Sequence, residues 1–145
     1  MVETTEEARR LRYSVTRLAR QLRRQAGTDL TPTQSAALVS IERHGPVTIG
    51  DLATHEQVSA PTATNVVSKL EAAGLVSRRK DDADRRVCHV ELTPAGRAEL
   101  ETSRNRKTSW LAARLNGLSD ADLAKLTAAL DVLEQLTEAP AGAQP

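Results

Sequence analysis

The chain has 145 residues, the common size of a single domain, and its only aromatic residues are one Tyr and one Trp, so the core must be built from Leu, Val, Ile and Ala. One cysteine excludes an internal disulfide framework, and no apolar run approaches the roughly 20 residues that span a bilayer. The net charge is +1, but ten basic and six acidic residues fall between positions 75 and 115, a local basic stretch that can bind a polyanion.

The start of the chain predicts one long amphipathic helix over residues 6–26. Glu3, Glu6 and Glu7 stand where the basic part of a secretory leader would be, so we expect a cytoplasmic protein without membrane association. The helix carries seven arginines among and beside its apolar positions. Gly27 is expected to end it. Its apolar stripe, with spacings of four, three and four residues, consists of Leu11, Val15, Leu18 and Leu22.

A second helix is predicted to begin at Thr31. Pro32 suits the first helical position, and Gln34 is placed to complete a capping box with the threonine. The helix should run to about His44, where a Gly-Pro pair follows.

Two further helix caps fall close together in residues 47–76. Thr48 is expected to begin a short helix of about two turns. Ser59 should begin another, with Pro61 tolerated in its first turn and Gly74 at its end. The apolar stripe of this helix is formed by Ala63, Val66, Val67 and Leu70. The expected local structure is helix, tight turn, helix.

The outward face of the helix after Ser59 is small, hydrogen-bonding and free of acid until Glu71. A merely solvated helix face more often carries Glu and Lys pairs at i, i+4, whereas a face of this kind suits contact with the edges of bases. It consists of Ala60, Pro61, Thr62, Thr64, Asn65, Ser68 and Lys69.

Two strand-like runs follow, Leu75–Lys80 and Arg86–Leu92, with the sequence DDAD as the turn of a hairpin between them. In the second run Cys88, Val90 and Leu92 lie on one side, which we expect to be the inner face. A cysteine there would act as a small hydrophobic residue.

The remaining chain predicts two helices. Thr93 caps the first, with Pro94 in its first position. Ser119 caps the second, with Asp122 completing the pattern. By composition, residues 138–145 form a disordered tail. The apolar positions of the last helix are Leu123, Leu126, Leu130 and Leu133.

The stretch RRKDDADRRVCHVELTPAG resembles the signature of the MarR family of bacterial transcription regulators, which has an Asp-x-Arg pair in the wing, here Asp84 and Arg86, and then a Leu-Thr strand end. The sequences LTPTQSAAL at 30–38 and LEAAGLV at 70–76 are also similar to the family, and the resemblance covers about residues 6–137. It implies an all-α fold with a small two- or three-stranded β wing.

The resemblance also implies a division of this single domain. Residues 30–93 would form a winged helix-turn-helix lobe that binds DNA, and residues 6–29 and 94–137 would form dimerisation helices. A 64-residue winged module cannot cover the apolar stripes of both terminal helices, which agrees with intertwining of two copies. The alternative, a monomer in which the stripes pack on each other, remains open.

The Asp-x-Arg pair has a physical reason that is independent of the family. An Arg that reaches the minor groove gains from its concentrated negative potential, but loses much of that gain to rotamer entropy unless it is held. Asp84 is placed to hold Arg86 by a charge-assisted hydrogen bond. Phosphate contacts would come from Arg78, Arg79, Lys80 and Arg85. An isolated charge run of this kind would be a solvated hairpin, but here it follows a helix-turn-helix.

By the resemblance, the helix after Ser59 enters the major groove. Many family members have Arg where this chain has Asn65, and Asn favours adenine whereas Arg favours guanine, so the preferred site is predicted to shift toward A·T. The residues that would contact DNA on this helix are Ser59, Ala60, Pro61, Thr62, Thr64, Asn65, Ser68 and Lys69.

The resemblance implies a homodimer on a pseudo-palindromic operator in double-stranded DNA, a repressor that a small aromatic or anionic effector releases. Tyr13, Arg17 and Trp110 are the candidate effector residues, although packing at the dimer interface is an equal explanation for the two aromatic side chains. Two alternatives stay open. One is a winged-helix adaptor that binds protein, and the other is a redox-responsive regulator that acts through Cys88.

No other chemistry has a local signature. His44, His55 and His89 lack a paired i, i+4 spacing and an accompanying Cys or carboxylate cluster, so we expect no metal and no cofactor. The sequence has no phosphate-binding loop, nucleophile elbow, Ser-x-x-Lys or HExxH, so we expect no enzymatic activity.

Overall fold

The computed structural model describes residues 2–138, so the predicted disordered tail lies, apart from its first residue, outside the described residues. The chain folds as two compact units, which meet within one long helix between Thr108 and Ser109. The elements are α1 (Val2–Gln25), α2 (Pro32–His44), β1 (Val47–Thr48), α3 (Ile49–Glu56), α4 (Ala60–Ala72), β2 (Val76–Lys80), β3 (Cys88–Leu92), α5 (Pro94–Asn116) and α6 (Asp120–Thr137).

The predicted helix starts are confirmed in detail. The Thr31 hydroxyl accepts the N–H of Gln34 at 3.1 Å, and the Gln34 side chain accepts the N–H of Thr31 at 3.1 Å, which is the expected capping box of α2. The other predicted caps accept the N–H three residues on in the same way: Thr48 at α3, Ser59 at α4 and Ser119 at α6. These ends are therefore fixed by local chemistry.

The turn between α3 and α4 is tight because Gln57 adopts a left-handed backbone conformation, with φ of 54°. The next amide, of Val58, donates to the Ala53 carbonyl at 3.0 Å and closes the end of α3. Ser59 then begins α4. The expected helix-turn-helix is confirmed.

The wing is a three-stranded antiparallel sheet in the order β1-β3-β2. In the β2–β3 hairpin, Val76 pairs with Leu92 and Lys80 pairs with Cys88. The third strand is β1, which pairs Val47 with Val90, and it is too short to be visible as a strand in the sequence. Arg86, placed in a strand by the sequence, belongs instead to the loop at the hairpin tip.

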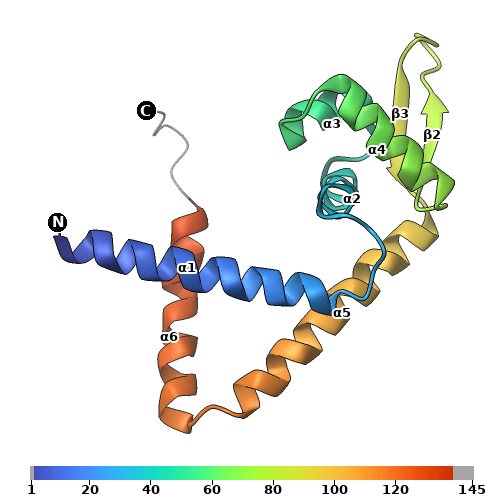
Figure 1. Ribbon diagram of the computed structural model, residues 1–145. Coiled ribbons are helices and arrows are strands. Elements are labelled where there is room, and N and C mark those ends of the chain that lie inside the picture. Colours follow the sequence, from blue (N-terminus) through green and yellow to red (C-terminus); the bar gives the residue numbers. More distant parts are fainter. Residues whose placement is uncertain (1, 139–145) are drawn as a thin grey trace. The chain divides into compact units, whose positions relative to one another are not determined.

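The hydrophobic core is formed by side chains from α2, α3, α4 and the sheet, which Figure 1 shows gathered at one end of the chain's first unit. The predicted stripe of α4 is buried along its whole length, at Ala63, Val66, Val67 and Leu70. The inner face of β3 is confirmed at Val90 and Leu92, whereas Cys88 is only half-buried because it lies next to the loop at the hairpin tip. The largest fully buried side chains are Leu38, Ile41, Leu52, Leu70, Val67 and Val90.

The junction of β3 and α5 depends on a close backbone approach. The Thr93 hydroxyl donates to the Gly74 carbonyl at 2.6 Å and accepts the N–H of Gly96 at 3.0 Å. Gly96 is buried, and a Cβ at this position would overlap the Leu75 carbonyl oxygen. The Leu-Thr-Pro-Ala-Gly sequence therefore fixes the start of α5 against the end of α4.

The terminal helices expose apolar side chains within their own units. In α1, which begins earlier than predicted, Leu11, Val15 and Leu18 are 38%, 52% and 42% exposed. In α6, Leu123, Leu126 and Leu130 are 36%, 36% and 48% exposed. Side chains of this kind need a covering surface.

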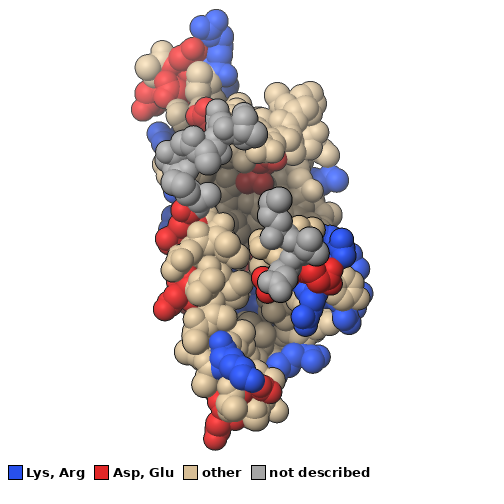
Figure 2. All heavy atoms as spheres, turned by 90° about the vertical axis from the view of Figure 1, so that its left-hand side faces the viewer, with Lys and Arg blue, Asp and Glu red and all other residues tan. Residues whose placement is uncertain are grey.

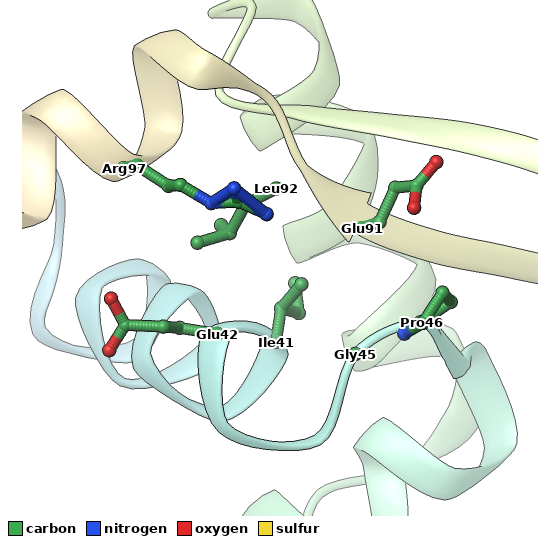
Figure 3. A pocket seen from close by; sticks show the side chains of 7 residues that line it. All are labelled: Ile41, Glu42, Gly45, Pro46, Glu91, Leu92 and Arg97. Carbon is green, nitrogen blue, oxygen red and sulfur yellow. The ribbon is translucent and has the colours of Figure 1, made fainter.

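An ion pair ties α2 to α5. Arg104 donates two hydrogen bonds to the Glu42 carboxylate, at 2.7 and 3.1 Å. A cavity of about 100 Å³ lies beside this pair, and Figure 3 shows the Arg97 side chain extending from α5 toward Leu92. The Arg104 hydrogen bonds, helped by the charges of Arg104 and Arg97, lower the pKa of Glu42 below its ordinary value.

Replacing Glu42 by Gln is expected to lower the stability by roughly 0.5 kcal/mol near neutral pH, because the pair is partly exposed. Since the pKa of Glu42 is lowered by folding, its contribution is present above its ordinary pKa of 4.5 and is lost as the pH falls through the folded-state value. Urea unfolding of the wild type and of Glu42→Gln, near neutral pH and at about pH 3, measures the difference in their free energies of unfolding. A difference that persisted in acid would contradict it.

Candidate nucleic-acid interface

The outward face of α4 is available as predicted. Each of its seven residues from Ala60 to Lys69 is exposed. Ser59 and Thr64 use their hydroxyl groups locally, in the cap and in a 2.9 Å bond to the Ala60 carbonyl. Asn65 and Lys69 make no side-chain hydrogen bond or ion pair to any residue between 2 and 138. Their polar groups are therefore free to contact a ligand.

The predicted contact between Asp84 and Arg86 is present at the hairpin tip. Arg86 Nε donates to Asp84 Oδ1 at 3.1 Å and Nη2 donates to Oδ2 at 3.3 Å, while the Arg86 backbone N–H also donates to Oδ1 at 3.0 Å. The Arg86 side chain is nevertheless 91% exposed. The side-chain bond from Arg86 and then its backbone bond lower the pKa of Asp84. The guanidinium is thus both oriented and accessible.

Asp81, which the sequence analysis did not single out, shapes the loop that carries this pair. Its Oδ2 accepts the backbone N–H of Ala83 at 3.0 Å and of Asp84 at 2.8 Å, and its Oδ1 lies 3.0 Å from His89 Nε2. The Asp84 backbone bond and then the His89 bond lower the pKa of Asp81. The signal in the sequence was Asp followed by two turn residues, since Asp side chains bond backbone amides two residues on.

The basic residues of the hairpin are not equivalent. Arg79, Lys80 and Arg85 are exposed and have no side-chain partner among the residues described. Arg78 is turned toward α4 instead, where Nη2 donates to Ser68 Oγ at 2.6 Å and Nε lies 3.4 Å from Glu71 Oε1. Three of the four side chains predicted to contact phosphate therefore have no partner among the described residues, and the fourth, Arg78, already contacts α4.

The hairpin tip concentrates charge of both signs. Figure 2 shows Lys and Arg spheres beside Asp and Glu spheres at the upper end of the molecule, where Figure 1 places the tip of the β2–β3 hairpin. The acids at positions 81 and 84 are bonded within the loop, so Asp82 is the one acid of the tip without a partner among the described residues, beside the unpaired Arg79, Lys80 and Arg85.

The histidines have structural partners. The His44 and His55 rings stack with centroids 3.9 Å apart and join the ends of α2 and α3, and His89 contacts Asp81. Over residues 2–138, no group of three or more His, Cys, Asp or Glu side chains is arranged to hold a metal ion. Cys88 is a free thiol.

The candidate effector residues do not form one site in a single unit. Arg17 lies over the Tyr13 ring at 5.4 Å from its centroid, on the exposed side of α1. Trp110 belongs to the second unit, where Arg114 lies 4.4 Å from its ring centroid. These contacts are cation–π pairs within one helix each.

A larger hollow, missed by the sequence analysis, lies between α1, α2 and α5. Its volume is about 520 Å³, and its wall combines apolar side chains such as Leu30 and Val39 with four cations and, among the residues described, no acid. In the sequence, only the basic C-terminal end of α1 pointed to this hollow. The tertiary structure adds a cation of α5 beside that end. The cations are Arg20, Arg23, Arg24 and Lys107.

None of the helices within residues 2–138 is both long and apolar enough to cross a membrane.

Comparisons with known proteins agree with this geometry. The model of the MarR family matches residues 30–88. An uncharacterized HTH-type transcriptional regulator of Mycobacterium leprae is 33% identical over 132 residues, 90% of this chain and 92% of the relative. The HTH-type transcriptional repressor NicR of Pseudomonas putida is 36% identical over 72 residues, 50% of this chain and 46% of the relative. The crystal structure of a transcriptional regulator protein from Pseudomonas aeruginosa has a TM-score of 0.87 and 31% identity, and covers 97% of this chain and 99% of that one.

Proposed function

Because the chain belongs to the MarR family of HTH-type transcriptional regulators, we propose that it is a homodimeric repressor that binds a pseudo-palindromic operator in double-stranded DNA. The observation that carries the proposal is the held but 91% exposed Arg86 side chain, on a hairpin next to the small polar face of α4. Repression is supported by the similarity to NicR. DNA binding also implies the cytoplasm as the place of action.

In this function α4 reads base edges in the major groove and the hairpin follows the backbone into the minor groove. Asn65 is the side chain best suited to read a base, since its amide is free and pairs with adenine. Arg79, Lys80 and Arg85 supply phosphate contacts. Arg86 enters the minor groove with little further loss of rotamer entropy, because Asp84 already holds its guanidinium in the free protein.

The test is fluorescence anisotropy with duplexes that tile the region around the protein's own gene, at two salt concentrations. Tight binding to one fragment, with affinity that falls steeply with salt, supports the proposal because each phosphate contact releases counterions. A protein that bound no fragment above the salt-sensitive background would favour the adaptor function, and a partner captured independently of salt would establish it.

The redox and enzymatic alternatives have less support. Cys88 is half-buried in a strand, and no cationic side chain of residues 2–138 is bonded to it, whereas a reactive thiol is stabilised by such a neighbour. The names of the relatives and the family that they share indicate a transcriptional regulator. We therefore propose that the protein is not an enzyme.

Dimerisation through α1 and α6 explains their exposed apolar side chains. Two copies related by a two-fold axis would place two α4 helices on half-sites one helical turn, roughly 34 Å, apart. The leucines at 123, 126 and 130 lie on one side of α6, as the helical repeat requires for a shared seam.

Leu130→Asp is expected to convert the dimer to a monomer, because it places a charge within that apolar seam. Analytical ultracentrifugation measures the mass. Ala128→Asp is the matched control, since Ala128 is exposed on the opposite side of α6 and should leave the dimer intact. A Leu130→Asp protein that sedimented as a dimer would refute the role of this stripe.

We further propose that a small aromatic anion, held in the 520 Å³ hollow, releases the operator. The hollow offers apolar contact and four cations, which suits a carboxylate on a ring. A ligand there touches α1, α2 and α5, so it can favour a separation of the α4 helices that does not match the operator. The ligand needs to favour that separation by only about 1 to 3 kcal/mol to release the operator.

Millimolar benzoate, as a probe, is expected to lower the operator affinity of the wild type about tenfold. Arg20→Gln should weaken this response, because it removes one cation from the hollow. Arg10→Gln, on α1 but outside the hollow, should respond as the wild type does. The proposal fails if Arg20→Gln and the wild type respond equally to benzoate in the anisotropy assay.

A further inference from the structure

Arg78 differs from the other basic residues of the hairpin in where its side chain goes. It stands in β2, where its backbone pairs with Val90 of β3. Its side chain is only 26% exposed and lies against α4. Arg79, the next residue, points to the other face of the strand and is exposed.

The Arg78 guanidinium contacts two side chains that are one turn apart on α4. Nη2 donates to Ser68 Oγ at 2.6 Å, and Nε lies 3.4 Å from Glu71 Oε1. Nε is buried and makes no hydrogen bond to any described residue, so the 3.4 Å ion pair with Glu71 is the contact that offsets its burial. Glu71 is the only acidic residue of α4, and Arg78 neutralises it.

We infer that Arg78 is a positioning residue that fixes the angle between α4 and the hairpin, and that it does not contact phosphate. An Arg side chain that already makes a hydrogen bond and an ion pair to one helix must break both contacts to reach the DNA backbone. With the link intact, α4 in the major groove and Arg86 at the hairpin tip keep one fixed separation. Arg78 therefore contributes to discrimination between sequences and adds nothing to the general attraction to DNA.

This inference rests on the proposed operator binding. Two measurements, the salt slope and the ratio of operator affinity to mixed-sequence affinity, distinguish an arginine that contacts phosphate from one that positions the helix. A phosphate contact adds about 0.9 to the slope of log K against log salt concentration and strengthens binding to every sequence. A positioning residue changes the ratio of operator affinity to mixed-sequence affinity and leaves the slope unchanged.

The experiment compares Arg78→Ala with Arg79→Ala, its neighbour on the opposite face, on the best-bound duplex from the tiling and on a mixed-sequence duplex of equal length. Arg79→Ala is expected to lower the salt slope by about 0.9 and to keep the affinity ratio. Arg78→Ala is expected to keep the slope and to lower the ratio about tenfold, the effect of losing one base contact. The inference is wrong if Arg78→Ala shows the pattern of Arg79→Ala.

A second variant covers the case in which Arg78→Ala does not fold. Ser68→Ala/Glu71→Gln removes the hydroxyl acceptor and the negative charge that Arg78 contacts on α4, and retains the arginine. The affinity ratio should again fall about tenfold, and Glu71→Gln alone, which leaves the DNA-contacting Ser68 in place, should lower it in the same direction. If Arg78 served phosphate, its release would leave the ratio unchanged and strengthen binding to both duplexes, which would overturn the inference.

Urea unfolding gives a test that needs no DNA. If the three side chains act as one link, adding Arg78→Ala to Ser68→Ala/Glu71→Gln should not lower the unfolding midpoint further. Additive shifts of the midpoint would contradict the link. A wild type that bound none of the duplexes would overturn the proposed function, and the link between α4 and β2 would then be decided by this measurement.

Discussion

Arg86→Ala is expected to lower the affinity for the operator by about 10- to 100-fold. The exposed guanidinium is the side chain best placed to enter a narrow minor groove, where the negative potential is concentrated. Its loss also removes one cation, so the salt slope should fall by about 0.9. Anisotropy titrations at several salt concentrations measure both quantities.

Asp84→Asn is the matched control for this prediction. It preserves the size of the side chain and the charge of Arg86, but weakens the bonds that orient the guanidinium. The affinity should fall less than in Arg86→Ala, because orientation is lost and the cation remains. Operator binding by Arg86→Ala that equalled the wild type would remove the hairpin tip from the interface.

Leu70→Ala is expected to lower the free energy of unfolding by about 3 kcal/mol. Leu70 has no exposed surface, and it belongs to the core in which α4 packs on α2, α3 and the sheet. The loss combines the transfer of the removed methyl and methylene groups with the cavity that remains. Urea unfolding followed by circular dichroism measures the change.

Lys69→Ala, one residue earlier in the same helix, provides the comparison. Its side chain is exposed and unpaired within residues 2–138, so the free energy of unfolding should change by less than about 0.5 kcal/mol. The description of the core would be refuted if both variants lost the same stability. In DNA binding the order reverses, because Lys69→Ala should weaken binding and folded Leu70→Ala should retain it.

Local chemistry made much of the fold predictable. Thr31, Thr48, Ser59 and Ser119 cap their helices in the structure because each cap needs only a side-chain oxygen and the amide three residues on. The buried stripe of α4 follows from helical spacing alone. The contact between Asp84 and Arg86 was predictable for the same reason, since the two residues are separated by one position.

The features that the sequence did not reveal depend on residues far apart in the chain. β1 has two residues and becomes a strand only because β3 lies beside it. Arg78 looks like Arg79 in the sequence, and only the packing of β2 on α4 gives it Ser68 and Glu71 as partners. The hollow beside α1 likewise needs Lys107 from α5. Spacing along one element could not have identified these contacts.

The loop from Asp81 to Val87 satisfies its polar groups largely within itself. Asp81 accepts from Ala83 and Asp84, its own amide donates to the Val87 carbonyl at 2.9 Å, and the amide of Val87 donates to the Asp84 carbonyl at 3.0 Å. Outside the loop, its side chains need only His89, on the adjoining strand. For protein engineering, residues 81–89 are therefore a transplantable cassette. Grafted between two antiparallel strands of another hairpin, they would carry an arginine in the same orientation without the rest of the lobe.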